Sequence, residues 1–108
     1  MNINDESFKD FVLDQLRELD GVDARRMFGG HGLYQDETFF GILHKGKLYF
    51  KVGESTVGEY RKRKMKPFRP NARQTLASYY QVPVEILEDN EQLCDWAVKA
   101  VHCQQLKK

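Results

Sequence analysis

Four short apolar segments follow one another between Val22 and Val52 and are separated by very few residues. The separating residues are of the types found in tight turns: Gly29-Gly30, Asp36-Glu37 and Lys45-Gly46. Neighbouring parallel strands need a crossover of a dozen residues or more, which links of this length cannot supply. The sequence therefore predicts an antiparallel meander, with strands at roughly 22–28, 31–35, 38–44 and 47–52.

Helical patterns lie on both sides of this meander. The first begins at an Asp5 cap, stops at Gly21 and has an apolar stripe: Phe8, Phe11, Val12, Leu16 and Leu19. The last begins at an Asn90 cap and has its own stripe: Leu93, Trp96, Ala97, Ala100 and Val101. Because a period of 3.6 residues places each stripe on one side of its helix, we expect both helices to pack on the sheet.

The segment between the meander and the last helix is less regular. A second helix is expected from Ser55 or Thr56 to Lys64, because Pro67 prevents its extension. Residues 65–73 contain two prolines and are interpreted as an irregular loop or a short edge segment. A short strand at 79–82 and a helical turn from Pro83 through Leu87 complete the prediction.

The predicted fold is a single α+β domain spanning residues 1–108, with an antiparallel β-sheet of about four to five strands flanked by N-terminal and C-terminal helices. Hydrophobic residues make up 41% of the chain and charged residues 31%, which is typical of a globular domain and not of a disordered one. No segment approaches the roughly 20 apolar residues of a membrane span, and the N-terminus lacks the features of a secretory signal. We expect a cytoplasmic protein that does not contact a membrane.

The turn at Lys45-Gly46 sets the pairing of the third and fourth strands. A two-residue turn places Leu43 opposite Leu48, Gly41 opposite Phe50 and Phe39 opposite Val52, on the core side. The other side then carries Phe40, Ile42, His44, Lys47, Tyr49 and Lys51. A slip of one residue would exchange the two sides. If no helix covers that other side, Phe40, Tyr49, Lys47 and Lys51 form a face for protein contact or for a homodimer.

A basic segment lies between residues 61 and 73, where no acidic residue occurs. Its seven basic residues are Arg61, Lys62, Arg63, Lys64, Lys66, Arg69 and Arg73. One interpretation is a solvated surface. The other is contact with nucleic-acid phosphate or an acidic partner through Lys62, Arg63, Lys66, Arg69 and Arg73.

The sequence signals for phosphate binding, metal binding and catalysis are weak. The glycines of residues 28–32 resemble a phosphate-binding loop only superficially, because no Gly-Lys-Ser/Thr ending and no helix start follow, so we interpret them as a strand connection. No ligand spacing indicates a metal, no cofactor motif occurs and no nucleophile motif is present, so we expect no catalytic residues, no metal, no cofactor and no enzyme. Cys94 and Cys103 lie half a turn out of phase on one predicted helix and are expected to be free thiols.

Several motifs occur in the order of one known family. They are Arg25-Arg26-Met27-Phe28-Gly29-Gly30-His31-Gly32-Leu33-Tyr34, Phe39-Phe40-Gly41-Ile42-Leu43, Lys47-Leu48-Tyr49-Phe50-Lys51-Val52, Met65-Lys66-Pro67-Phe68, Ser78-Tyr79-Tyr80-Gln81-Val82-Pro83, Leu87-Glu88-Asp89 and Leu93-Cys94-Asp95-Trp96-Ala97. In these motifs the chain resembles the N-terminal domain family of TfoX, also called Sxy, the regulators of competence genes in Gram-negative bacteria.

The resemblance implies a regulator of competence or related genes, acting with the cAMP receptor protein at promoters. It implies scaffold geometry for Met27, Phe28, Gly29, Gly30 and Gly32. Family members with the competence role usually carry a second, C-terminal domain, whereas this sequence ends at Lys108. Two function classes remain open: a non-enzymatic module that works by protein contact, and a direct nucleic-acid-binding domain that uses residues 61–73.

Overall fold

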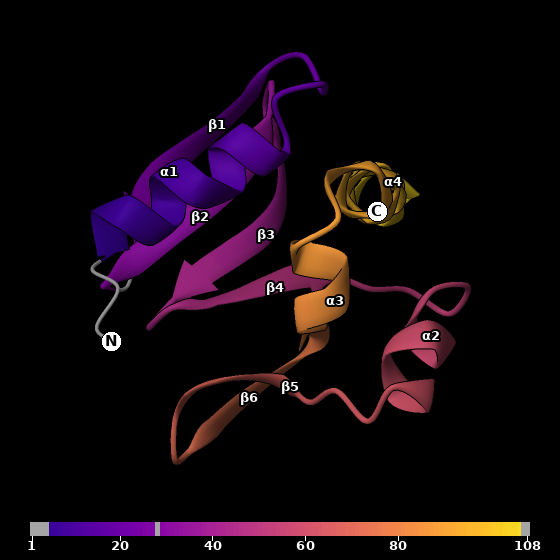
Figure 1. Ribbon diagram of the computed structural model, residues 1–108. Helices are drawn as coiled ribbons and strands as arrows, with labels where there is room; N and C mark the ends of the chain where they lie inside the picture. Colours follow the sequence, from indigo (N-terminus) through magenta and orange to yellow (C-terminus); the bar gives the residue numbers. More distant parts are fainter. Residues whose placement is uncertain (1–4, 28, 107–108) are drawn as a thin grey trace.

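The computed structural model describes residues 5–27 and 29–106 and has the predicted α+β architecture. All the larger helices lie on one side of a twisted antiparallel sheet (Figure 1). The elements in chain order are α1 (Asp5–Gln15), β1 (Val22–Met27), β2 (Gly30–Gln35), β3 (Thr38–His44), β4 (Lys47–Lys51), α2 (Val57–Lys62), β5 (Pro67–Asn71), β6 (Gln74–Gln81), α3 (Val84–Leu87) and α4 (Asn90–Leu106).

The sheet has six strands in the order β1-β2-β3-β4-β6-β5, which is more than the four or five expected. The meander of the first four strands is confirmed. The additional strand is β5, the segment interpreted from sequence as a loop or a short edge segment. Its two prolines, Pro67 and Pro70, are tolerated because β5 lies at the edge of the sheet. On the outer side of an edge strand no neighbouring strand needs a hydrogen bond from a backbone N–H, which proline lacks.

Two of the three predicted pairs of β3 with β4 are confirmed, Leu43 opposite Leu48 and Gly41 opposite Phe50. The predicted placement of Phe39 on the core side opposite Val52 is wrong, because the two side chains belong to different apolar clusters. The turn between β3 and β4 has positive φ at both positions, 51° at Lys45 and 75° at Gly46. This is the geometry of a type I′ turn, whose twist matches the twist of the two strands. The turn therefore fixes which side chains face the helices from Gly41 to Phe50.

The main core lies between the sheet and the helices. The stripe residues Phe8 and Val12 of α1, and Leu16 directly after it, are buried there against Leu33. The other helices and strands contribute Phe40, Leu43, Leu48, Phe50, Val52, Tyr60, Tyr80, Val82, Ile86, Leu93, Ala97, Ala100 and Val101. Phe11, which we expected in the stripe, is instead 42% exposed. It lies about 100° around the helix from Val12 and so points away from the sheet.

Helix α4 begins at Asn90, but its cap differs from the predicted one. The side chain of Asp89 accepts a hydrogen bond from the backbone N–H of Gln92 at 3.1 Å and another from the Gln92 side chain at 2.9 Å. An acceptor three residues before a free helical N–H is the usual N-cap arrangement. Asp89 rather than Asn90 therefore caps the helix.

Helix α2 is shorter than expected because Lys64 has a φ of +63°. The backbone N–H of Met65 donates to the carbonyl of Tyr60 at 2.9 Å, as in a Schellman motif. Lys64 thus occupies the left-handed position at which glycine is usual. No helix in the described ranges is long and apolar enough to cross a membrane.

Candidate functional site

The side of the sheet opposite the helices carries a second cluster of apolar and aromatic side chains, which we call the outer face. Its members are Tyr34, Phe39, Ile42, His44, Lys47, Tyr49, Phe68, Leu76 and Tyr79. All of them come from strands, and no residue of a described helix belongs to this cluster. The outer face is therefore the part of the sheet that the helices leave uncovered.

Ring contacts run across the outer face from β2 to β5. Phe39 on β3 lies between Tyr34 and Tyr79, at ring-centroid distances of 5.2 and 5.6 Å. Phe68 on β5 contacts both Tyr49 and His44, at ring-centroid distances of 4.7 and 5.2 Å. Tilted and edge-on ring pairs at such distances are favourable beyond the area that they bury. The aromatic residues therefore hold one another in a fixed arrangement.

The predicted position of Phe40 on this face is wrong, because Phe40 is fully buried in the main core. On β2, Leu33 and Tyr34 are consecutive, yet their partners on β3 are Gly41 and Phe39. Phe40 is thus the extra residue of a β-bulge, which breaks the alternation of the strand. Phe39 takes the outward position that we had assigned to Phe40.

The other three residues predicted for this face differ in accessibility. Lys47 is exposed and Tyr49 is half-buried against Phe68. Lys51 is buried, with its ammonium nitrogen 5.5 Å from the centroid of the Tyr79 ring. Lys47 and Tyr49 are available to a partner, whereas the expected accessibility of Lys51 is wrong because its charge is packed on an aromatic ring.

Burial shifts the ionisation of the groups on this face. Burial raises the pKa of Tyr79 to about 12, with a smaller contribution from the neighbouring Tyr34. Burial also raises the pKa of Tyr49 and lowers the pKa of His44, where the charge of Lys45 acts in the same direction. These shifts favour neutral side chains, so the aromatic centre of the outer face is uncharged at neutral pH.

Positive charge lies at the margins instead. The guanidinium of Arg25 on β1 lies 4.2 Å from the centroid of the Tyr34 ring, and Lys47 lies at the end of β4 beside His44. Arg25 and Arg26 point to opposite sides of β1, as alternation along a strand requires. The outer face thus combines an apolar aromatic centre with basic edges.

Gly32 allows the side chains of Met27 and Phe39 to approach the backbone of β2 closely. A Cβ atom at Gly32 would collide with the Sδ of Met27 and would lie 2.8 Å from Cε1 of Phe39. The ring of Phe39 can cross β2 at this point only because no side chain is present. Gly32 is therefore part of the scaffold of the outer face, in agreement with the structural interpretation of the glycine-rich segment, whose Phe28 lies outside the described residues.

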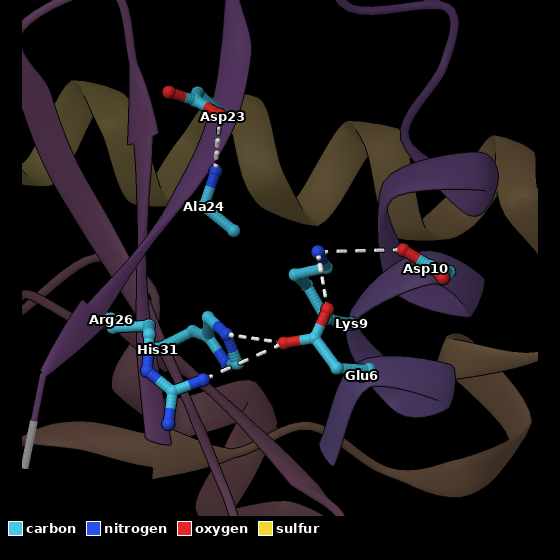
Figure 2. A network of polar contacts seen from close by, with 7 residues as sticks. All are labelled: Glu6, Lys9, Asp10, Asp23, Ala24, Arg26 and His31. Atoms are coloured by element: carbon cyan, nitrogen blue, oxygen red, sulfur yellow. Dashed lines mark hydrogen bonds and ion pairs between the residues drawn. The ribbon is translucent and has the colours of Figure 1, made fainter. Parts of the chain in front are cut away.

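His31, in the same segment, points to the other side of the sheet and joins β2 to α1. Figure 2 shows Glu6 of α1 surrounded by the side chains of Lys9, Arg26 and His31. The Lys9 ammonium donates to Glu6 at 2.9 Å, Arg26 lies 3.7 Å away, and Nε2 of the buried His31 lies at 3.6 Å. The hydrogen bond and charge of Lys9 are the main causes that lower the pKa of Glu6. This network fastens α1 to the sheet.

The residues of the basic segment do not form one uniform patch. Arg63 on the end of α2 donates to Glu85 at 2.9 Å, contacts Glu59 at 3.8 Å and lies over the ring of Trp96. Lys62 pairs with Glu59 at 3.6 Å. The charges of this part of the segment are therefore partly neutralised by carboxylates that the chain itself supplies.

Further along the segment, Arg69 and Arg73 lie on the β5–β6 hairpin, and Lys66 immediately precedes β5. All three are exposed, although the Arg69 guanidinium donates to the backbone carbonyl of Ala72 at 2.9 Å. The structure thus divides the predicted contact residues into a paired group on α2 and an exposed group on the hairpin.

Two further observations concern metal binding and the two cysteines. Within the described ranges, no group of three His, Cys, Asp or Glu side chains is arranged to hold a metal ion. Cys94 and Cys103 are both free thiols, as expected, with Cys94 half-buried and Cys103 buried. Burial raises the pKa of Cys94, which disfavours its thiolate.

A comparison with models of protein families identifies the family of this chain. The model of the TfoX N-terminal domain matches residues 14–104, from the end of α1 through nearly all of α4. The chain belongs to this family. The matched range contains both the outer face and the basic segment, so both are parts of the TfoX N-terminal domain. A comparison with curated proteins found no significant match.

Proposed function

We propose that this TfoX N-terminal domain is a non-enzymatic regulatory module that binds another protein through its outer face. The observation that carries the proposal is the uncovered side of the sheet, where the half-buried rings of Tyr34, Phe39 and Tyr49 adjoin exposed Lys47. Aromatic side chains in a fixed arrangement, with charged residues at the rim, are the usual composition of a protein-binding hot spot.

The family relationship supports a role in the regulation of competence or related genes. We propose that the partner is the cAMP receptor protein bound at a promoter, as the resemblance to the competence regulators implies. The basic margin of Arg25 and Lys47 suits an acidic patch on such a partner, because complementary charge increases the rate and the specificity of association. The aromatic centre would supply most of the affinity.

Direct nucleic-acid binding is the second candidate. It is favoured by the exposure of Lys66, Arg69 and Arg73 on and beside the β5–β6 hairpin. Contacts of this kind release counterions from phosphate, so affinity falls steeply with salt. We rank this function second because Lys62 and Arg63, which were expected to contribute, already contact Glu59 and Glu85.

The test uses two charge-reversed variants with the same number of changes. One carries Arg25→Glu and Lys47→Glu at the outer face, and the other carries Lys66→Glu and Arg73→Glu in the basic segment. Fluorescence anisotropy would measure binding to the cAMP receptor protein and to duplex DNA, at about 50 and 200 mM salt. Sedimentation velocity of the free domain would detect a homodimer formed through the outer face.

Protein contact predicts salt-tolerant binding to the receptor protein that the outer-face variant loses and the basic-segment variant keeps. Nucleic-acid binding predicts the reverse pattern, with an affinity for DNA alone that falls by orders of magnitude over this range of salt. Loss of binding only in the basic-segment variant would contradict the proposed function. If the free domain forms a dimer and the outer-face variant abolishes it, the partner of the outer face is a second copy of the domain and not the receptor protein.

A further inference from the structure

The sheet ends in two edge strands, β1 and β5, which lie far apart in Figure 1 and differ in regularity. On β5, Pro67 and Pro70 lack a backbone N–H, and the pairing of β5 with β6 is irregular at two places. Proline and irregular pairing are usual devices that prevent an edge from pairing with another strand. β1 contains no proline, and its six residues pair with β2 without interruption. β1 is therefore the edge to which a further strand can be added.

Two hydrogen bonds show which backbone groups of β1 point away from the sheet. Gly21, directly before β1, accepts a bond at 2.9 Å from the N–H of Asp36, which directly follows β2. The N–H of Ala24 instead donates to the carboxylate of the neighbouring Asp23 at 2.9 Å. Because successive residues of a strand direct their backbone groups to opposite sides, Ala24 and the residues two positions before and after it present these groups away from β2. In the described part of the chain, no strand pairs with them.

The charges on β1 are self-complementary. Arg25 lies over the ring of Tyr34, so Arg25 and Asp23, two positions apart, both lie on the outer-face side of the strand. Both are exposed, and within one copy Nε of Arg25 is 4.0 Å from Oδ2 of Asp23, a long distance for an ion pair. If a second copy pairs antiparallel with β1 so that Ala24 faces Ala24, each Asp23 faces Arg25 of the other copy. Opposite charges at facing positions stabilise a strand pair.

The same charges disfavour the neighbouring registers. The outward backbone groups could also pair if one strand moved by two residues in either direction. One movement places Asp23 opposite Asp23 of the second copy, and the other places Arg25 opposite Arg25. Like charges at facing positions are destabilising. In the register centred on Ala24, Arg26 faces Val22, so no like charges meet on the helix side either.

We propose that β1 is a dimerisation edge and that its partner is β1 of a second copy of this chain, paired antiparallel about Ala24. The two-fold axis is perpendicular to the sheet, so two six-stranded sheets become one continuous sheet. Both outer faces then lie on the same side of the dimer. The dimer does not depend on what the outer face binds, but it presents that face twice to a partner.

Sedimentation velocity at protein concentrations from about 10 μM to 1 mM measures this association, because a single strand pair forms a small and weak interface. The unsubstituted domain should dimerise in this range. Asp23→Arg and Arg25→Asp should each weaken the dimer at least about tenfold, since each change places two like-charged pairs across the axis. The amide hydrogen of Ala24 should exchange more slowly as the protein concentration rises.

A mixture of the two variants gives the most specific result. A copy with Asp23→Arg carries two arginines at the interface and a copy with Arg25→Asp carries two aspartates, so a mixed dimer restores both attractive pairs. The equimolar mixture should therefore dimerise more strongly than either variant alone, which also shows that both variants are folded. A variant with both changes should dimerise by itself. Lys99→Asp, a charge reversal on α4, is the matched control and should leave dimerisation unchanged.

The outer-face variant changes Arg25 as well as Lys47, so its effect on a dimer belongs to the outer face only if Lys47→Glu alone has the same effect. The dimer through β1 should persist in Lys47→Glu, and its loss there would overturn the proposal. A monomer at every concentration, single variants that dimerise normally, or a mixture that does not associate would overturn it as well. Protection of the Ala24 amide only after addition of the cAMP receptor protein would also do so, and would assign the edge to an extended segment of that protein.

Discussion

The ring of Phe68 lies 4.7 Å, centroid to centroid, from the ring of Tyr49, and this contact connects the β5–β6 hairpin to the centre of the outer face. Phe68 is almost fully buried although β5 is an edge strand. The hairpin therefore closes one flank of the face that we propose as the site of protein contact. Loss of this ring would weaken both the fold and the site.

Phe68→Ala should destabilise the domain by about 3–5 kcal/mol, because truncation of a buried aromatic residue removes its burial and leaves a cavity. Phe11→Ala is the matched control, since Phe11 is exposed on α1 and its truncation should cost less than about 1 kcal/mol. Urea unfolding gives both values. Similar losses for the two variants would contradict the assignment of Phe68 to a packed outer face.

Lys64→Gly should stabilise the domain by about 1 kcal/mol, because glycine adopts the left-handed conformation of this position without a steric cost. Lys62→Gly, within α2, should destabilise it by about 0.5–1 kcal/mol, since glycine is unfavourable inside a helix. Denaturant unfolding distinguishes the signs of the two changes. Destabilisation by both substitutions would show that Lys64 is not held at a helix C-terminus.

Stability should decrease in alkali as Tyr79 ionises. The pKa of Tyr79 in the folded state is about 12, above the ordinary value of 10.0, so its contribution to stability is complete below pH 10 and is lost as the pH rises through 12. Thermal unfolding at a series of alkaline pH values would show the decline. In Tyr79→Phe the decline should be shallower, and an identical slope in this variant would exclude Tyr79 as a cause.

Asp89→Ala should lower the melting temperature of the domain, because it removes the cap of α4. Hydrogen bonds from the side chain and backbone of Gln92 lower the pKa of Asp89, so its contribution is present above pH 3.8 and is lost as the pH falls through the folded-state value. The melting temperatures of variant and unsubstituted protein should therefore converge in acid. Asp95→Ala, on the exposed side of α4, is the control and should have a smaller effect at neutral pH.

Much of the fold follows from local sequence signals. Turn residues and alternation predicted the meander, and the Lys45-Gly46 turn predicted the pairing of β3 with β4. The β5–β6 hairpin was not fully predicted because two prolines suggested a loop, whereas the edge position of β5 tolerates them. Phe68 between those prolines was the available signal, since an isolated aromatic residue in a polar segment has to be buried somewhere.

The candidate site was harder to predict because it depends on one irregular position. Strict alternation placed Phe40 outward, but the bulge turns Phe40 into the main core and presents Phe39 instead. No local signal distinguishes two adjacent phenylalanines, and only the packing of Phe40 against Phe50 decides between them. The pairing of Arg63 with Glu85 was likewise hidden, because the two residues are distant in sequence and meet only in the fold.

The most direct test of the central claim is nuclear magnetic resonance of the isotope-labelled domain during titration with the cAMP receptor protein. The account predicts that amide shifts change most in β2, β3 and β4, around Tyr34, Phe39 and Tyr49, and little in α4. Changes confined to residues 61–73, or to the helical side of the sheet, would contradict protein contact through the outer face.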